Sequence, residues 1–320
     1  PERSWKNSLA DKAKIPLLVI CGPTATGKTG VAIEMCKRLN GEVIGADSMQ
    51  IYQNLNIGTA KPTCAEMQMA IHHLVDFLPP SKKFSVADYM QAANASIAEI
   101  NGRGKLPIMV GGTGQYISSV VKGLHLTADK PDAALRQRLA LQAETEGIQA
   151  IYNRLCEIDL MYAKTLHPND KNRVLRAMEL YLQTGITMSV QLENSVPSEK
   201  PYNDLIIGLT YSNRELLYEN INKRVDIMVE NGLLSEAKLV YENQNLYITA
   251  AQAIGYKELF PYFDGVMPLE ECIIKLKQAS RNYAKRQLTW FKRMDNINWI
   301  TVDTENAVEK ILELQGSVNG

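Results

Sequence analysis

One short stretch constrains the fold of this chain more than any other. The apolar run from Leu17 to Cys21 leads directly into Gly-Pro-Thr-Ala-Thr-Gly-Lys-Thr, which fits the phosphate-loop pattern GxxxxGK[ST] at every fixed position. Apolar residues then recur at helical spacing, at Ala32, Met35, Cys36 and Leu39. A strand, this loop and a helix in that order predict a site where backbone N–H groups and a helix N-terminus bind a polyphosphate.

The loop offers two side chains besides its backbone. It consists of Gly22, Pro23, Thr24, Ala25, Thr26, Gly27, Lys28 and Thr29. In such loops the lysine reaches the outer phosphate oxygens and the last hydroxyl binds Mg²⁺, so we predict Thr29 as a magnesium ligand. A glycine-rich turn needed only for tight packing would require neither Lys28 nor Thr29. The loop leaves open whether the ligand is ATP or another polyphosphate.

Strand-like and helix-like segments alternate along the chain. The strand candidates are residues 17–21, 42–46, 107–110, 205–209 and 299–302. This alternation predicts an α/β fold of the P-loop NTPase type, a parallel sheet with helices on both faces. Ligands of such sheets bind at the carboxyl ends of the strands. We therefore expect the loop 22–29, the segment ADSMQIY at 46–52 and the segment GGTGQY at 111–116 to line the site.

The pattern changes between residues 124 and 200, where only helical spacing is evident. Residues 131–146 predict one helix, and Asn169 is expected to cap a second that Gly185 ends. We therefore predict an all-helical insertion domain at 124–200 and a catalytic core at 15–123 and 201–320. Two further boundaries are predicted: Gly41 ends the first helix, and Ser212 with Glu215 forms a capping box.

Asp47 follows a strand at the ligand edge, so its carboxylate is expected to face the bound phosphates. It is a candidate Mg²⁺ partner or a general base, and a simple turn cap is the structural alternative. ATPases of this fold usually end a neighbouring strand in an acidic residue that holds Mg²⁺. Here residues 107–110 run into Gly-Gly-Thr-Gly instead, which disfavours an ATPase and leaves Thr113 as a polar contact.

Positive charge is concentrated in a segment near the C-terminus. Residues 273–294 contain seven Lys or Arg and no acid, although Lys plus Arg and Asp plus Glu are balanced at 35 each over the 320 residues. On a helical wheel an apolar stripe is bordered by two basic edges, which favours a surface that binds a polyanion such as nucleic acid. A solvated helix face is the alternative. Arg173 and Arg176 add two cations in the insertion.

Composition excludes several other classes. The five cysteines are scattered without a CxxC pair, which argues against a zinc site or a disulfide framework and suits a reducing cytoplasm. His72 and His73 have no Cys or acid at metal spacing, so we interpret them as packing or hydrogen-bonding residues. No run of about 18 apolar residues is present, so no membrane span or membrane partner is predicted.

With these residues in view, the chain resembles the bacterial-type tRNA dimethylallyltransferases, also called tRNA isopentenyltransferases. The resemblance rests on GPTATGKT (22–29), ADSMQIY (46–52), GTAKP (58–62), FSVADY (84–89), GGTGQY (111–116), HPND (167–170), AIGYKEL (253–259) and YAKRQLTWFKR (283–293). It implies that the phosphate loop binds the diphosphate of dimethylallyl diphosphate, with Mg²⁺. The acceptor it implies is N6 of the adenosine that follows the anticodon of tRNA, and the enzyme would be a cytoplasmic monomer.

The resemblance also implies site residues. Asp47 is the implied base, with Thr113 and Arg136 near the reaction channel. The implied contacts to the anticodon stem-loop are Asp47, Ser48, Met49, Gln50, Asn172, Arg173, Val174, Leu175, Arg176, Gln252, Gly255, Tyr256, Lys257, Lys285, Arg286, Gln287, Trp290 and Lys292. Asn172 stands where the family often has Gln.

Three other functions remain open at this point. An adenylate isopentenyltransferase would prenylate free AMP or ATP with the same chemistry, but would have little use for a helical insertion and a basic helix. A small-molecule kinase would use Asp47 as the base that activates a substrate hydroxyl. It would normally have an arginine-rich lid, and Arg136 and Arg138 could form only a weak version of one. A non-catalytic RNA-binding module would not need Lys28, Thr29 and Asp47 together.

Overall fold

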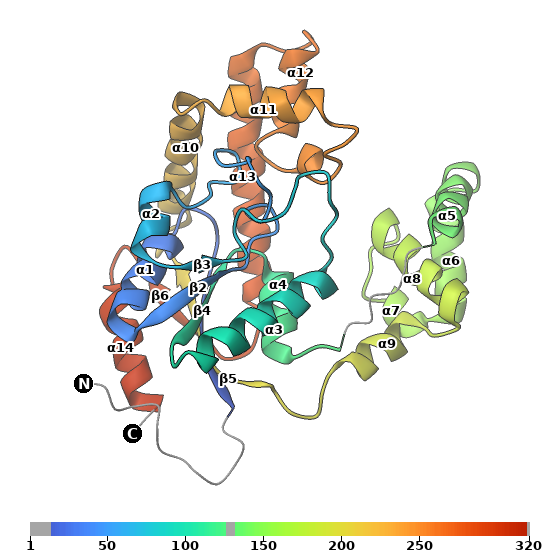
Figure 1. The fold of residues 1–320 in the computed structure, drawn as a ribbon. Coiled ribbons are helices and arrows are strands. Elements are labelled where there is room, and N and C mark those ends of the chain that lie inside the picture. The colour runs from blue at the N-terminus through green and yellow to red at the C-terminus, as the bar shows by residue number, and fades with distance from the viewer. Residues whose placement is uncertain (1–13, 126–131, 319–320) are drawn as a thin grey trace. The chain divides into compact units, whose positions relative to one another are not determined.

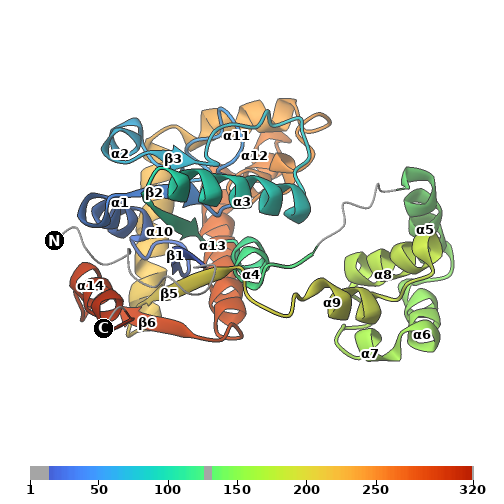
Figure 2. The same cartoon turned by 60° about the horizontal axis from the view of Figure 1, so that its bottom comes forward.

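The computed structural model describes residues 14–125 and 132–318. The chain divides into two compact units: Pro1–Val121 together with Pro201–Gly320, and Lys122–Lys200. Figures 1 and 2 show the first unit in blue to teal and in gold to red, and the second in green to yellow-green. Within the described ranges, no helix is long and apolar enough to cross a membrane.

The first unit is built on a six-stranded sheet in which every pairing is parallel, in the order β3-β2-β4-β1-β5-β6. The strands are β1 (Ile15–Cys21), β2 (Gly41–Gly45), β3 (His72–His73), β4 (Leu106–Gly111), β5 (Tyr202–Thr210) and β6 (Ile297–Thr301). Five of them confirm predicted strands. Only β3 was missed, because a two-residue strand leaves no periodic pattern.

Helices cover both faces of this sheet (Figure 2). The helices of this unit are α1 (Lys28–Leu39), α2 (Cys64–Met69), α3 (Val86–Gly102), α4 (Gly114–Lys122), α10 (Arg214–Glu230), α11 (Leu233–Glu242), α12 (Phe260–Phe263), α13 (Leu269–Phe291) and α14 (Ala307–Val318), with the 3-10 turns Ala250–Gln252 and Lys257–Leu259. The central strand β1 is almost wholly buried between β4 and β5, which explains its unbroken apolar sequence. The α/β prediction is therefore confirmed.

The second unit is helical throughout its described residues. It contains α5 (Ala133–Thr145), α6 (Ile148–Ile158), α7 (Leu160–Ala163), α8 (Lys171–Thr184) and α9 (Met188–Ser195). Leu135, Leu139, Ile151, Leu155 and Val174 are buried in a core of its own. A separate apolar core is what allows such an insertion to fold as a unit.

Three predicted helix boundaries were wrong by one residue. Asn40, in the left-handed conformation, ends α1, and Gly41 is already the first residue of β2. Asp170, not Asn169, caps α8, and Gly185 ends that helix as predicted. Asn213 caps α10. Ser212 instead bonds to Asp303, so no capping box forms there. In the two N-terminal cases a second capping residue stood beside the predicted one and made the bond.

A buried carboxylate stabilises the sheet at the amino ends of its strands, opposite the cavity side. Glu42, at the start of β2 and 1% exposed, accepts hydrogen bonds from His73 Nε2 (2.6 Å), Arg103 (2.6 Å) and Lys105 Nζ (2.8 Å). Burial raises the pKa of the Glu42 carboxyl. The bonds from Lys105, His73 and Arg103 outweigh burial and lower that pKa to about 2. The His73 bond fits the predicted hydrogen-bonding role of the histidine pair.

Glu42→Gln should reduce the free energy of unfolding at neutral pH by roughly 3 kcal/mol, since three donors lose a carboxylate. Because the folded pKa lies below the unfolded value, this stabilisation is complete above about pH 4.3 and disappears as the pH falls towards 2. Urea unfolding followed by the fluorescence of Trp290 and Trp299, both in this unit, measures it.

The matched control is Glu34→Gln, which removes an exposed pair with Arg38 on α1 and should cost less than about 0.5 kcal/mol. Equal losses in the two variants would contradict a special role for Glu42.

Candidate active site

The phosphate loop is shaped by close contact with the neighbouring strand. A Cβ atom on Gly22 would lie 2.4 Å from the Leu209 carbonyl oxygen, and Gly22 has a φ of 140°. Ala25 (φ 66°) and Gly27 (φ 76°) complete a left-handed path that ends at the first residue of α1. Successive N–H groups of such a loop converge on one anion.

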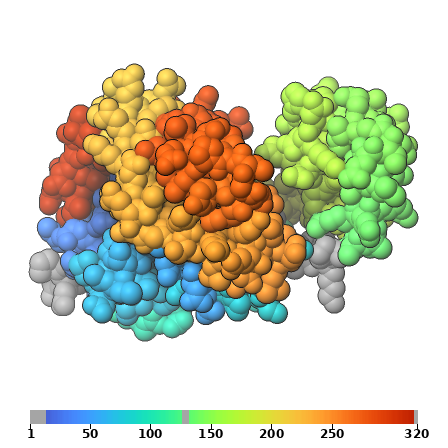
Figure 3. Space-filling model, turned by 90° about the horizontal axis from the view of Figure 1, so that it is seen from above, coloured from blue at the N-terminus to red at the C-terminus, as the bar shows by residue number. Residues whose placement is uncertain are grey.

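A cavity of about 520 Å³ opens in front of this loop. Figure 3 looks down on this end of the unit, where α10–α13 (gold to orange) lie beside the loops of residues 46–80 (blue to cyan). The wall formed by the strand ends consists of Thr24–Gly30, Asp47–Gln50, Gly58–Ala60 and Val110–Gly112. The facing wall includes Ile221, Arg224, Val225, Met228, Gln252, Ile254, Gly255, Lys257, Leu276, Ser280, Tyr283, Arg286 and Gln287. Three sequence segments that we predicted at the strand ends thus meet at one cavity, although Thr113 itself is not part of its lining.

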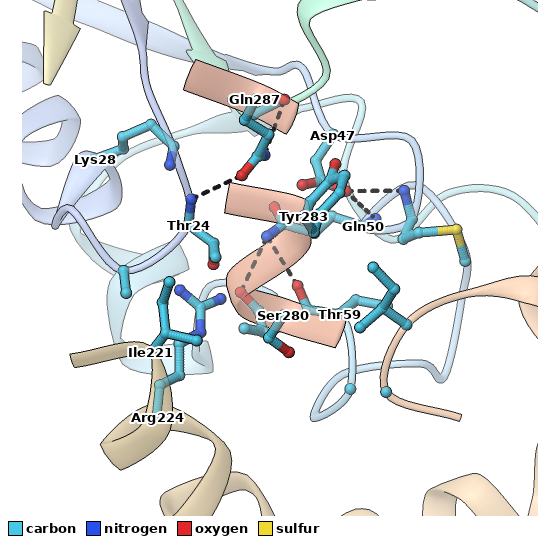
Figure 4. Close-up of a pocket in the computed structure, with 18 of the residues that line it drawn as sticks. Thr24, Lys28, Asp47, Gln50, Thr59, Ile221, Arg224, Ser280, Tyr283 and Gln287 are labelled. Atoms are coloured by element: carbon cyan, nitrogen blue, oxygen red, sulfur yellow. Dashed lines mark hydrogen bonds between the residues drawn. The ribbon is translucent and has the colours of Figure 1, made fainter. Parts of the chain in front are cut away.

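Two cations lie on opposite walls of this cavity (Figure 4). Lys28 Nζ folds back to donate to the Pro23 carbonyl (2.6 Å). Burial and the nearby Arg224 lower the pKa of Lys28 to about 8, although Asp47 acts in the opposite direction. Burial also lowers the pKa of Arg224. These two cations, with Asp47 and Glu66 as the carboxylates of the lining, form a site that an anion would complete.

Gln287 of α13 holds the loop to the end of β4. Its Oε1 accepts from Thr24 N (3.0 Å), and its Nε2 donates to Gly112 O (2.9 Å), as Figure 4 shows. A Cβ atom on Gly112 would lie 2.2 Å from Gln287 Nε2, so only glycine leaves room for this bridge. The C-terminal helix therefore helps to fix the anion site.

Asp47 has both a structural bond and a free edge. Its Oδ1 accepts from Met49 N (2.9 Å) and Gln50 N (3.4 Å), so the turn-cap alternative is correct as far as it goes. Among the described residues, no hydrogen bond reaches Oδ2. Since Asp47 lines the cavity, that second oxygen is available to a ligand.

Thr113 supports this turn from the neighbouring strand. Its hydroxyl accepts from Ser48 N (3.0 Å) and donates to Ser48 Oγ (3.4 Å), while its own N–H donates to Ala46 O (3.1 Å). Thr113 is therefore bonded to the residue beside Asp47. Arg136, in contrast, belongs to α5 of the second unit and donates to Glu179 (2.9 Å); its predicted place near the reaction channel stays a prediction.

The predicted nucleic-acid contacts divide by exposure. Gln252, Lys257, Lys285, Arg286, Trp290, Lys292, Asn172 and Arg173 are exposed, and Ser48, Met49, Gln50, Leu175 and Arg176 are partly exposed. Val174, Tyr256 and Gln287 are buried in the protein, at 0%, 0% and 5% exposed, and Gln287 lines the cavity. RNA contact through these three side chains stays a prediction. Gly255 is also buried and contributes backbone only.

Sequence reasoning missed Arg224, Ser280 and Tyr283. Tyr283 contacts Arg286, which lies over its ring at 5.6 Å, and burial raises the pKa of its hydroxyl. Tyr283 falls on the apolar side of its helix, where an aromatic residue indicates packing, and Arg224 looks like any cation of an amphipathic helix. No local pattern could mark Arg224, because only the tertiary fold brings α10 to the loop.

Lys28→Ala should weaken the binding of inorganic diphosphate roughly 10- to 100-fold, because a charge-assisted hydrogen bond is lost. Above a pKa of about 8 the free lysine is neutral, so wild-type affinity should also fall, relative to that of the variant, between pH 7 and pH 9. Calorimetric titration at both pH values measures this.

Lys37→Ala changes an exposed lysine in the last turn of the same helix and should leave the affinity unchanged. Equal affinities for diphosphate in the wild type and Lys28→Ala would remove Lys28 from the anion site.

Comparison with known protein families extends this picture. The profile of the IPP transferase family matches residues 50–294, and that of the isopentenyl transferase family matches residues 15–79. The first match alone covers well over half of the chain, and the second contains the phosphate loop.

Individual relatives agree. The tRNA dimethylallyltransferase of Caldanaerobacter subterraneus is 46% identical over 301 residues, covering 93% of this chain and 96% of that protein. The corresponding enzyme of Bacillus subtilis is 45% identical, with coverages of 90% and 91%.

Two solved structures are also similar. The full-length tRNA isopentenylpyrophosphate transferase of Bacillus halodurans has a TM-score of 0.70 at 44% identity, covering 95% of this chain and 96% of that one. A eukaryotic dimethylallyltransferase acting on tRNA has a TM-score of 0.79 at 30% identity, covering 95% and 79%. With this identity over almost its whole length, the chain belongs to the tRNA dimethylallyltransferase family.

Proposed function

We propose that this protein transfers the dimethylallyl group of dimethylallyl diphosphate to N6 of the adenosine at tRNA position 37, directly 3′ of the anticodon, and releases diphosphate. The observation that carries the proposal is a single cavity that is lined by the anion-binding loop with Lys28, by Arg224 of α10 and by the carboxylate of Asp47. A cation-rich end suits a diphosphate, and a carboxylate beside it suits an amine that must lose a proton.

The diphosphate end of the donor would occupy the loop. Its oxygens would accept from the loop N–H groups, and Lys28 would turn from the Pro23 carbonyl towards them. As the allylic carbon–oxygen bond breaks, negative charge grows on the leaving diphosphate, and preformed cations stabilise that growth. No phosphoryl group moves, so the site does not need the strand-end carboxylate of an ATPase.

The donor set of this site fits Mg²⁺ but not a metal held by protein alone. In the described part of the chain, no three His, Cys, Asp or Glu side chains come together as a metal site. Mg²⁺ commonly keeps several waters and binds substrate phosphates with only one or two protein ligands. Thr29, which lines the cavity, would supply that ligand. When bound, the ion would neutralise charge on the leaving diphosphate.

Asp47 would take the proton from the acceptor. The N6 nitrogen attacks C1 of the allyl group, the carbon–oxygen bond to diphosphate breaks, and one N6 proton passes to Asp47 Oδ2. The hydrogen bonds from Met49 N and Gln50 N to Oδ1 hold the carboxylate in place while Oδ2 accepts the proton. Thr113 fixes the same turn and thereby acts as a positioning residue.

The adenosine must leave the stacked anticodon loop to reach this cavity, as bases do in other enzymes that modify them. The exposed cations Lys257, Lys285, Arg286 and Lys292, with Gln252 and Trp290, would bind the RNA beside the cavity. On the helical unit, Asn172, Arg173, Leu175 and Arg176 would contact the stem-loop, and Arg136 would lie near the reaction channel. Two of the seven cations of residues 273–294 are less available, since Lys275 pairs with Glu271 and Lys277 with Asp226.

Two alternatives fit the chemistry but not the whole chain. An adenylate isopentenyltransferase would leave the helical unit and the exposed cations of α13 without a role. A kinase would need ATP at the loop and a mobile cationic lid. We also expect the enzyme to act as a monomer in the cytoplasm, where its tRNA substrate is found.

The decisive experiment follows label from dimethylallyl diphosphate with Mg²⁺ in parallel reactions that contain unmodified tRNA, AMP or ATP. Label in tRNA alone supports the proposal. Label in AMP or ATP would instead identify an enzyme that acts on free nucleotides. Turnover of ATP without any labelled product would indicate a kinase.

Asp47→Asn and Asp47→Ala separate the base from the turn. The Asn side chain can still accept from Met49 N but cannot take a proton, so we expect the transfer rate to fall roughly 100- to 10,000-fold with tRNA affinity kept. Asp47→Ala should lose the turn as well and bind tRNA more weakly. Single-turnover rates and filter-binding affinities measure these effects. Near-normal transfer by Asp47→Asn would exclude Asp47 as the base.

A further inference from the structure

Two motifs of this chain, GTAKP at 58–62 and AIGYKEL at 253–259, have no role in the chemistry described so far. In the structure they pack against each other. A Cβ atom on Gly58 would lie 2.5 Å from the ring of Tyr256, and one on Gly255 would lie 3.2 Å from the Gly58 carbonyl oxygen. Only glycines allow this approach, so the contact restricts where the loop of residues 56–61 can lie relative to Tyr256.

Glu236 of α11 fastens both motifs. Its Oε2 accepts from Asn56 N (2.7 Å) and Ile57 N (3.0 Å), and its Oε1 accepts from Ile57 N (3.0 Å), Gly58 N (2.8 Å) and the Tyr256 hydroxyl (2.9 Å). Three successive N–H groups converging on one carboxylate form an anion nest. Every bond is charge-assisted and therefore stronger than a neutral one.

A buried lysine holds the same loop from its other side. Lys61, 3% exposed in its side chain, donates to Tyr52 O (2.7 Å), Asn56 Oδ1 (2.8 Å) and Asp76 Oδ1 (2.5 Å). The loop is thus fixed by a carboxylate and an ammonium group. Neither Glu236 nor Lys61 lines the cavity.

What this loop presents to the cavity is a pair of carbonyl groups. Gln50 Nε2 donates to Thr59 O (3.2 Å) and Ala60 O (3.0 Å), as Figure 4 shows for the labelled Gln50 and Thr59. Carbonyl oxygens only accept, so the amide nitrogen of Gln50 must face them, and both of its hydrogens are used. The group that Gln50 can still offer is Oε1, a hydrogen-bond acceptor.

An acceptor at this point has a consequence for the base that enters. Adenine carries one donor group on its hydrogen-bonding edges, the N6 amine, whereas N1 and N7 accept. Gln50 also lies in the Asp47 turn, because Gln50 N donates to Asp47 Oδ1. An N6 amine beside this turn can donate one hydrogen to Gln50 Oε1 and lose the other to Asp47.

We infer that Glu236 is a positioning residue for base selection: by fixing the loop of residues 56–61 it orients the Gln50 amide so that an acceptor faces the 6-amino group of the target adenine. This inference rests on the proposed function. According to it, Glu236, which lies outside the cavity, influences which purine the cavity accepts.

The test measures the binding of anticodon stem-loops that carry adenosine or purine riboside, which lacks the 6-amino group, at the target position. The wild-type protein should prefer adenosine roughly 100-fold, the value of two hydrogen bonds, one to Gln50 and one to Asp47. In Glu236→Gln an amide NH₂ would face the nest of N–H groups, so the loop should shift and the preference should fall roughly tenfold, by the share of Gln50. The affinity for inorganic diphosphate, bound on other elements, should stay unchanged.

Glu242→Gln is the matched control, since it makes the same change at an exposed position of the same helix. It should keep the full preference for adenosine. Tyr256→Phe removes a single donor to Glu236 Oε1 without burying a new polar group. It should reduce the preference in the same direction but less, and it serves if Glu236→Gln does not fold.

A double-mutant cycle separates positioning from a loss of stability. If Glu236 acts through Gln50, Glu236→Gln should have no further effect on base preference in a Gln50→Ala background. An undiminished preference for adenosine in folded Glu236→Gln, or in Tyr256→Phe, would overturn the inference. So would an equal effect with and without Gln50. Failure of the proposed function is separate, because it would appear as wild-type protein that transfers no label to tRNA.

Discussion

The active site depends on how closely backbone segments approach at the carboxyl ends of four strands. A Cβ atom on Gly22 would meet the Leu209 carbonyl at 2.4 Å, and one on Gly111 would meet the Ala46 carbonyl at 2.0 Å. These contacts lie where β1, β2, β4 and β5 end. They bring the phosphate loop, the Asp47 turn and the Gly-Gly-Thr-Gly segment to one cavity, and a side chain at either glycine would separate them.

Around this framework the charges are arranged unequally. Burial lowers the pKa of both Lys28 and Arg224, the nearby Arg224 lowers that of Lys28 further, and Asp47 and Glu66 are the carboxylates close to this pair. An anion with two or more charges would relieve this imbalance, so the free enzyme is prepared for a diphosphate rather than for a neutral ligand. In the proposed reaction Asp47 takes up a proton from the acceptor amine and must release it again before the next turnover.

The sequence could predict those parts of the site whose signal is local. The phosphate loop, Asp47 and the strand ends were found because each lies next to its own strand and obeys a known spacing. Arg224 was not found, since its place in the site depends on how α10 packs against a loop almost two hundred residues earlier. The role of Glu236 could not be predicted either. In the sequence it looks like any solvent-exposed acid of a helix, and only the fold shows that three backbone N–H groups donate to it. Tyr256 and Gln287 show the converse, because the residues in conspicuous motifs proved to be buried supports.

The helical insertion enters the chain after α4 and returns before β5, and it has an apolar core that shares no residue with the core of the sheet. The residues proposed for the chemistry and the RNA contacts proposed for α8 are therefore encoded in separable stretches of sequence. Substitutions on the outer faces of α5–α9 can accumulate without disturbing Asp47 or the phosphate loop. An enzyme organised in this way can follow changes in its tRNA partners over evolutionary time while its reaction stays constant.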